Sequence, residues 1–303
     1  MATRILDLPA EEYMLPGNRA CAGCGLGIGL RHILKAFDGK CIMAVPASCL
    51  TVLGGMYPSS SVRVPWMNVV FPSTAAAASG LVAGLKATGR EDIPVLAMAG
   101  DGGTADIGIQ ALSGAAERNT NFIYICYDNE AYMNTGTQRS GLTPLGVRTT
   151  TTPVQGKQQI PKDMPRILEA HGVPYIATAC PSFPTDLYDK VKKAIGIRGT
   201  RYLHLATPCP AGWQYNPKDT VEMGRLAVET GSVVLFEIEN GMFRLTSRSK
   251  KLAEQGELMP VREYMERQGR YKNLDEATIA AVQEWIDRRW ADYVRRDAES
   301  AQA

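Results

Sequence analysis

The chain has 303 residues, of which 45% are hydrophobic and 21% charged, and its formal net charge is +2. These values are typical of a globular protein with one large core, and the near balance of charge gives no reason to expect a nucleic acid or an anionic membrane as partner. The longest apolar stretches are far shorter than the roughly 20 residues that span a bilayer. The N-terminal residues lack the apolar segment and cleavage site of a secretory signal, so we expect a cytoplasmic protein.

Helical and strand patterns alternate along most of the chain. In chain order they predict a helix over 23–37, strand 41–45, helix 75–87, strand 94–99, helix 105–117, strand 121–127, helix 162–170, strand 174–178, helix 185–195, strand 202–206, a helix near 220–229 and strand 233–239, then polar helices from 261 to the end. This alternation is typical of a doubly wound α/β domain, with a mostly parallel sheet covered by helices on both faces. We expect this domain over residues 1–240 and a helical C-terminal extension over 241–303.

Two long irregular segments interrupt this alternation, at residues 46–72 and 128–161. Each follows a predicted strand, and the first is rich in Gly, Pro and Ser. Long irregular segments inside a compact domain usually carry function. Both segments are therefore candidates for the walls of a binding site at the carboxyl edge of the sheet.

A glycine-rich turn and a distant Asn indicate a phosphate and metal site. Gly100, Asp101, Gly102 and Gly103 follow one strand, and Asn129 follows the next strand along the chain. A carboxylate and an amide oxygen at the same sheet edge can bind Mg²⁺, which then bridges two phosphates. The glycines let the backbone approach the anion, and the following helix directs its positive end at it. The alternative is a tight turn and an Asx-turn without a ligand.

The seven cysteines fall into two groups. Four lie in loops marked by Gly and Pro, and they suit a metal site: Cys21, Cys24, Cys49 and Cys209. The other three lie in or beside apolar strands, where we expect inert core packing: Cys41, Cys126 and Cys180. Four thiolates suit zinc and an iron-sulfur cluster equally, so the residues alone leave both metals open.

Five motifs occur in unbroken order between residues 17 and 215: CAGCG, PASC, MAGDGG, YDNEAYMNTGTQRS and PCPAGW. Together they resemble the β subunit of pyruvate:ferredoxin oxidoreductase and its relatives. The resemblance implies the thiamine diphosphate-binding fold and a 4Fe-4S cluster held by the four loop cysteines. It also implies thiamine diphosphate bound through Mg²⁺, with the side chains of Asp101 and Asn129 and the backbone carbonyl of Ala131 as ligands. Further roles follow for Ser48, Cys49 and Phe71, which would border the cofactor, and for Asn134, which would hydrogen-bond an oxygen of the substrate.

The same resemblance implies a reaction and partners. The reaction is oxidative decarboxylation of a 2-oxoacid of the pyruvate type, with electrons passing to ferredoxin and the acyl group to coenzyme A. Thiamine enzymes activate their cofactor with a Glu from a second domain of the same fold, and we predict one such domain here. We therefore expect a hetero-oligomer in which an α subunit supplies the Glu, together with a γ subunit and a ferredoxin-like δ subunit.

Three questions stay open at this point. Oxalate, phenylglyoxylate and branched-chain 2-oxoacid enzymes share this subunit plan, so the substrate is one of several. The rival functions are a non-redox thiamine lyase or synthase with incidental cysteines, and a zinc-stabilised binding protein. Met133 and Trp213 adjoin the candidate loops, where exposed packing is the simpler expectation for both.

Overall fold

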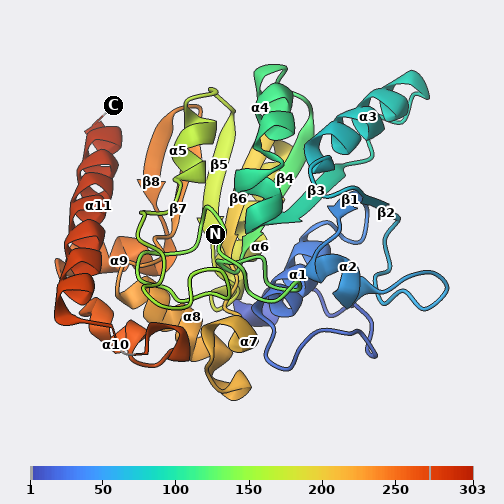
Figure 1. Ribbon diagram of the computed structural model, residues 1–303. Helices are drawn as coiled ribbons and strands as arrows, with labels where there is room; N and C mark the ends of the chain where they lie inside the picture. Colours follow the sequence, from blue (N-terminus) through green and yellow to red (C-terminus); the bar gives the residue numbers. More distant parts are fainter. Residues whose placement is uncertain (1–2, 273, 303) are drawn as a thin grey trace.

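The computed structural model describes residues 3–272 and 274–302, and one eight-stranded β-sheet forms its centre (Figure 1). The strand order is β2-β1-β3-β4-β6-β5-β7-β8. The parallel strands are β1 (Ile42–Pro46), β2 (Trp66–Val69), β3 (Val95–Gly100), β4 (Phe122–Asp128), β5 (Tyr175–Ala179) and β6 (Thr200–Ala206). At one edge β7 (Phe236–Glu239) and β8 (Met242–Leu245) pair antiparallel. The predicted doubly wound, mostly parallel α/β fold is confirmed.

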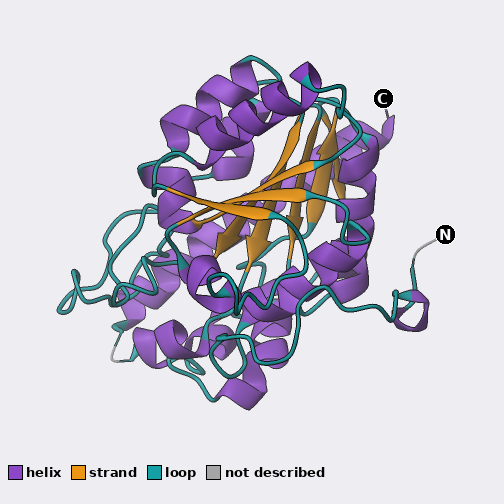
Figure 2. Cartoon of the chain, turned by 90° about the vertical axis from the view of Figure 1, so that its right-hand side faces the viewer, coloured by secondary structure: helices purple, strands orange, loops and turns teal. Residues whose placement is uncertain are grey.

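Helices cover both faces of this sheet (Figure 2). On one face α1 (Gly25–Ala36) packs beside α6 (Pro184–Gly196). The other face is covered by α3 (Thr74–Ala87), α4 (Ile109–Glu117), α5 (Met164–Glu169) and α11 (Glu276–Gln302). The remaining helices are α2 (Cys49–Gly54), α7 (Pro210–Trp213), α8 (Thr220–Glu229), α9 (Ser247–Gln255) and α10 (Val261–Met265), with single turns at Ile5–Asp7, Gly102–Asp106, Pro217–Asp219 and Gly269–Tyr271.

The central strands β3 and β4 supply side chains to both cores. Leu96 and Ile123 face the core under α1 and α6, whereas their neighbours Ala97 and Phe122 face the core under α3 and α4. Successive side chains of a strand point to opposite faces, so a strand buried on both sides is apolar throughout. This is why both strands were recognisable as continuous apolar runs.

The strand order reverses at β1, which lies between β2 and β3. In an open α/β sheet such a reversal opens a crevice at the carboxyl ends of the strands, and ligands bind there. The chain leaves β1 at Pro46, β3 at Gly100, β4 at Asp128 and β6 at Ala206. The predicted motifs that follow these strands therefore meet at one edge of the sheet.

Several predicted elements differ from those observed. The segment 46–72 contains α2 and β2, although we expected it to be irregular. The helix expected from residue 105 begins at Ile109, after a wide π-turn over Gly102–Asp106. Within that turn the Thr104 hydroxyl donates to the Gly100 carbonyl at 2.8 Å, so it occupies a carbonyl that a regular helix would pair with its own backbone. Strand β8 was not predicted, whereas α9 lies within the segment 241–303 that we expect to be helical.

The last part of the chain packs on the main sheet. β8 pairs with β7, and Tyr293 of α11 stacks on Phe243 of β8 with ring centroids 5.5 Å apart. The C-terminal helical extension is thus attached to the sheet through its own edge strand. No helix in residues 3–272 and 274–302 is long and apolar enough to cross a membrane.

Candidate cofactor and cluster site

Asp101 lies at the carboxyl end of β3 and is 2% exposed. The Ser140 hydroxyl donates a hydrogen bond to its carboxylate. Burial raises the pKa of Asp101 well above its usual range, and the negative charge of nearby Asp128 raises it further. A bound cation would reverse this effect, because a positive charge favours the ionised carboxylate.

Three oxygen atoms converge beside this carboxylate. The amide oxygen of Asn129 lies 3.2 Å from Asp101 Oδ1 and 3.0 Å from the Ala131 carbonyl oxygen. Without a cation the arrangement is relieved by turning the amide, so that its NH₂ group donates to both oxygens. Ligands of octahedral Mg²⁺ at about 2.1 Å lie about 3 Å from one another, so the spacing of the three oxygens fits this ion.

A cavity of about 180 Å³ opens next to these oxygens. Gly102 has no room for a side chain, because a Cβ atom there would lie 2.4 Å from the ring of Tyr132. Tyr132 and Phe71, with ring centroids 5.9 Å apart, form an aromatic wall. The buried Tyr127 hydroxyl lines the same cavity without a hydrogen-bond partner among the described residues, so it is available to a ligand.

All the residues predicted to contact the thiamine cofactor line this cavity, and so does Asn134, which was predicted to contact the substrate: Ser48, Cys49, Phe71, Gly100, Asp101, Gly102, Gly103, Asn129, Ala131 and Asn134. Ser48 is fixed by its hydroxyl, which donates to the Pro46 carbonyl at 2.7 Å. Asn134 is exposed at the mouth. The structure therefore brings together what the sequence spreads over 87 positions, from 48 to 134.

The four loop cysteines line a second cavity, of about 150 Å³. Cys21 and Cys24 belong to a turn in which the Cys24 amide donates to the Cys21 carbonyl at 3.1 Å. The next amide, of Gly25, donates to the Pro208 carbonyl at 3.1 Å and docks this turn against the segment that carries Cys209. The other three cysteines are buried in the hydrophobic cores, away from this cavity: Cys41, Cys126 and Cys180.

Burial raises the pKa of three loop thiols, those of Cys24, Cys49 and Cys209. It raises the pKa of Cys49 to about 12 and that of Cys209 to about 11, and the neighbouring thiols add to both effects. Burial also raises the pKa of Cys24. Metal binding requires thiolates, so a metal at this site must supply the positive charge that keeps them ionised. Among the described residues no three His, Cys, Asp or Glu side chains converge on a single metal ion.

The two cavities share a wall. Cys49, Asn129, Met133 and Asn134 line both of them. Cys49 begins α2 directly after β1, and the other three follow β4, so the switch point of the sheet places this wall. A ligand in the first cavity and a group held by the cysteines would therefore be immediate neighbours.

The expectation that Trp213 packs in an exposed loop is wrong. Trp213 is 1% exposed, and its indole Nε1 donates to the Asn129 carbonyl at 3.0 Å. The sequence feature that could have indicated this role is the position of Trp213, four residues after Cys209 and within the PCPAGW motif. The hydrogen bond from Ser140 to Asp101 was not predicted, although Ser140 is the last residue of the YDNEAYMNTGTQRS motif, because it lies inside the irregular segment 128–161 and shares no periodic pattern with Asp101.

Comparison with known proteins agrees with this geometry. The family described as "Thiamine pyrophosphate enzyme, C-terminal TPP binding domain" matches residues 49–205, which run from α2 into β6. A solved structure of the 2-oxoglutarate:ferredoxin oxidoreductase from Magnetococcus marinus shares the fold, with a TM-score of 0.59 and 21% identity over 89% of this chain and 94% of that chain. Fold and matched domain define a subunit of a thiamine pyrophosphate-binding enzyme.

Two relatives narrow this class. Pyruvate synthase subunit PorB of Methanothermobacter thermautotrophicus is 50% identical over 287 residues, covering 93% of this chain and 97% of that protein. Ketoisovalerate oxidoreductase subunit VorB of Pyrococcus horikoshii is 43% identical over 295 residues, covering 94% of this chain and 93% of that protein. The chain belongs to the family of these β subunits, which are components of 2-oxoacid oxidoreductase complexes.

Proposed function

We propose that this chain binds thiamine diphosphate with Mg²⁺ in the first cavity and a 4Fe-4S cluster in the second, within a complex that oxidatively decarboxylates pyruvate. The observation that carries the proposal is the wall of Cys49, Asn129, Met133 and Asn134 that the two cavities share. A non-redox thiamine enzyme has no use for four thiols at that place. A site for one zinc ion needs ligands that converge on one point, and these four instead surround a cavity.

Each residue of the first cavity has a definite task in this proposal. Asp101, Asn129 and the Ala131 carbonyl would hold Mg²⁺, and the glycines Gly100, Gly102 and Gly103 would let the diphosphate approach the backbone. The ring of Phe71 would exclude water from the reacting end. Asn134, at the open mouth, would donate a hydrogen bond to an oxygen of the substrate.

When bound, thiamine diphosphate supplies the electron sink for loss of CO₂ and the cluster accepts electrons one at a time. Overall, pyruvate, coenzyme A and two oxidised ferredoxins give acetyl-coenzyme A, CO₂, two reduced ferredoxins and one proton. The task of Cys21, Cys24, Cys49 and Cys209 is to hold the electron acceptor against the cofactor.

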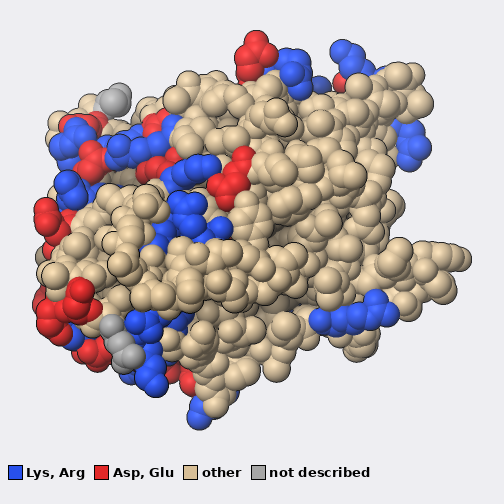
Figure 3. All heavy atoms as spheres, in the orientation of Figure 1, with Lys and Arg blue, Asp and Glu red and all other residues tan. Residues whose placement is uncertain are grey.

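A partner subunit completes this site. Asp101 is the one carboxylate among the described residues that line the first cavity, and it is committed to the metal. The Glu that activates the cofactor must therefore come from another chain, which we assign to an α subunit; γ and ferredoxin-like δ subunits would complete a cytoplasmic complex. The segment beside the cavity offers exposed apolar side chains to such a partner: Val52, Met56, Tyr57 and Val70. Figure 3 shows charges gathered over the C-terminal helices and few over the centre and right of the same face.

Metal analysis of the complex tests the cluster. Cys49→Ser should lose about four iron atoms per chain and the broad visible absorption of the cluster, relative to the unmodified complex. Cys41→Ala is the matched control, because Cys41 is a core cysteine that does not line the cavity. Equal iron content in the Cys49→Ser and unmodified complexes, or one zinc per chain in place of iron, would contradict the proposal.

The choice of substrate is tested by turnover. The 50% identity to a pyruvate synthase subunit, against 43% to a ketoisovalerate oxidoreductase subunit, favours pyruvate. The kcat/KM of the complex should be highest for pyruvate in a panel with 2-oxoisovalerate, 2-oxoglutarate, oxalate and phenylglyoxylate. A higher value for 2-oxoisovalerate would assign the complex to branched-chain substrates, and the subunit roles above would stand.

A further inference from the structure

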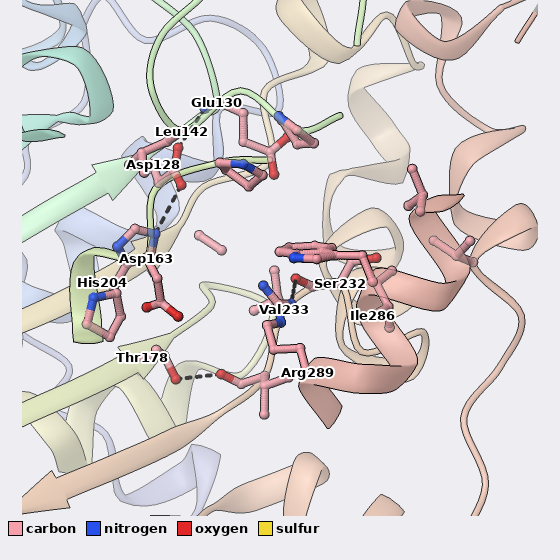
Figure 4. A pocket seen from close by; sticks show the side chains of 18 of the residues that line it. Asp128, Glu130, Leu142, Asp163, Thr178, His204, Ser232, Val233, Ile286 and Arg289 are labelled. Atoms are coloured by element: carbon pink, nitrogen blue, oxygen red, sulfur yellow. Dashed lines mark hydrogen bonds and ion pairs between the residues drawn. The ribbon is translucent and has the colours of Figure 1, made fainter. Parts of the chain in front are cut away.

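Side chains alternate across the loop 128–131 that carries two of the three converging oxygens. Asn129 and Ala131 line the cofactor cavity, whereas Asp128 and Glu130 line a separate cavity on the other side, together with His204 (Figure 4). The side chains of Asp128 and Glu130 thus pack on the side of the loop opposite to Asn129 and Ala131. Glu130, which lies between the two, has no place in the proposed chemistry.

Glu130 needs support to keep its conformation. Its φ is +69°, a left-handed conformation that is unfavourable for a residue with a side chain. This turn is what allows the side chain of Asn129 and the carbonyl of Ala131 to face the same point. Neighbouring groups hold the turn: the Glu130 amide donates to Asp128 Oδ1 at 2.8 Å, and the Thr143 hydroxyl donates to the Glu130 carbonyl at 2.6 Å.

The strongest support comes from a residue 140 positions away in sequence, Arg270. Arg270 is 2% exposed and forms an ion pair with the Glu130 carboxylate. Its guanidinium carbon also lies over the ring of Trp213, 4.1 Å from the ring centroid, and its Nε donates to Gln268 at 2.7 Å. A buried charge pair is expensive in desolvation, so it is weak evidence for stability and a better indication of a specific task.

These contacts form a closed ring of interactions around the loop 128–131. Arg270 forms an ion pair with the Glu130 carboxylate and lies over the ring of Trp213, and Trp213 donates to the carbonyl of Asn129. Trp213 also ends the short helix α7 that begins directly after Cys209, with its amide bonded to the Cys209 carbonyl at 2.8 Å. One arginine therefore touches both the loop with the metal ligands and the segment with a cluster cysteine.

We propose that Arg270 is a positioning residue, which through Glu130 and Trp213 holds the loop 128–131 so that Asn129 and Ala131 direct their oxygens at one cation. This inference rests on the proposed Mg²⁺ site. It gives the segment around Gly269–Tyr271 a role in cofactor binding, although this segment lies far in sequence from the loop 128–131.

The test removes both charges at once, so that no unpaired charge stays buried and the complex folds. In the complex carrying Glu130→Gln with Arg270→Met, calorimetric titration with thiamine diphosphate at a series of Mg²⁺ concentrations should give a half-saturating Mg²⁺ concentration 10–100-fold higher, the usual effect of losing a partner of a metal ligand. The matched control is Glu229→Gln with Arg248→Met, an ion pair at 2.6 Å between α8 and α9 outside the ring. Both pairs should lower Tm, and the control should leave the Mg²⁺ requirement unchanged.

A second measurement needs no cofactor. Hydrogen exchange of the amides of residues 129–133 should become faster in the cofactor-free Glu130→Gln/Arg270→Met complex and not in the control. An unchanged Mg²⁺ requirement, or equal changes in both variants, would overturn the positioning role. If the unmodified complex binds no thiamine diphosphate with Mg²⁺, the proposed function fails, and the exchange of residues 129–133 alone then decides whether Arg270 holds the loop.

Discussion

At the scale of single residues, Gly102 is the tightest point of the cofactor cavity. A Cβ atom there would lie 2.4 Å from the ring of Tyr132, whose hydroxyl is held by Asp106 at 2.9 Å. Because Tyr132 is fixed at both ends of its ring, Gly102→Ala must displace the glycine loop itself. We expect at least a tenfold loss of affinity for thiamine diphosphate, about 1.4 kcal/mol, measured by calorimetric titration at saturating Mg²⁺.

Gly80 provides the matched control for this substitution. It lies within α3, is exposed, and a Cβ atom there would meet nothing within 4 Å. Gly80→Ala should stabilise the chain by up to about 1 kcal/mol, because alanine loses less backbone entropy in a helix, and should leave cofactor affinity unchanged. Unchanged affinity in Gly102→Ala as well would show that the cavity tolerates a methyl group at this position.

The charge of Glu12 should make the free energy of unfolding depend on pH. Its carboxylate accepts from Arg31 at 2.5 Å and lies 2.8 Å from Lys35 Nζ, and these groups, Arg31 first, lower the pKa of Glu12 to about 2. A lowered pKa in the folded state contributes stability above the ordinary Glu pKa, and this stability is lost as the pH falls towards 2. With its side chain 32% exposed, Glu12→Gln should cost about 1 kcal/mol near pH 7.

The gap in free energy of unfolding between Glu12→Gln and the unmodified chain should shrink as the pH falls from about 5 and close only near pH 2, measured by urea unfolding at each pH. A gap that is constant across this range would mean that the pair with Arg31 contributes nothing through its charge.

The residues of the candidate site could be predicted to different extents. Asp101 and Asn129 follow strands at a spacing of one helix and one strand, so parallel-sheet geometry brings them together without further information. Trp213 and Arg270 could not be found in this way. Their partners Asn129 and Glu130 lie more than 80 positions away in sequence, and neither contact follows from a local period of helix or strand.

At the scale of elements, α11 is attached to the sheet by an aromatic cluster. Tyr293 is 4% exposed and packs against Phe236 and Phe243, with ring centroids at 5.2 Å and 5.5 Å. Tyr293→Ala would leave a cavity where β7, β8 and α11 meet, so we expect a loss of about 3–4 kcal/mol in urea unfolding. Arg288→Ala, exposed on the same helix, should change the stability by less than about 0.5 kcal/mol. A small loss in Tyr293→Ala would mean that α11 contributes little to the core.

The strands that sequence patterns missed are short and lie at the edges of the sheet. β2 and β8 have four residues each, at opposite edges, and both are partly exposed. Such strands carry neither a continuous apolar run nor a long alternation, and their pairing depends on neighbours from elsewhere in the chain. The long central strands β3 and β4, buried on both faces, were predicted to within one residue.

At the scale of the whole molecule, the chain presents two neighbouring cavities at one sheet edge and an open mouth beside exposed apolar side chains. The sequence predicts which loops carry the candidate ligands, because each candidate either follows a strand or, as for Cys21 and Cys24, lies just before helix α1. The wall that joins the cavities depends on the strand order at β1, which no local pattern contains. Under the proposed function, binding and activation of the cofactor are separable: this chain has the groups for binding, and a partner would supply the group for activation.

This separation can be measured on the C2 proton of thiamine diphosphate. The isolated chain should bind thiamine diphosphate with Mg²⁺, because Asp101, Asn129 and Ala131 are its own residues. Its cavity lacks a second carboxylate among the described residues, so exchange of the C2 proton for deuterium, followed by quenched-flow NMR, should be no faster than in free cofactor. In the assembled complex the exchange should accelerate by at least 10²-fold, the usual scale of general acid-base catalysis.

Asp101→Asn in the complex should abolish Mg²⁺-dependent binding and thereby the acceleration. Fast exchange in the isolated chain would mean that the activating group belongs to this chain, and that the partner serves only substrate or electron transfer.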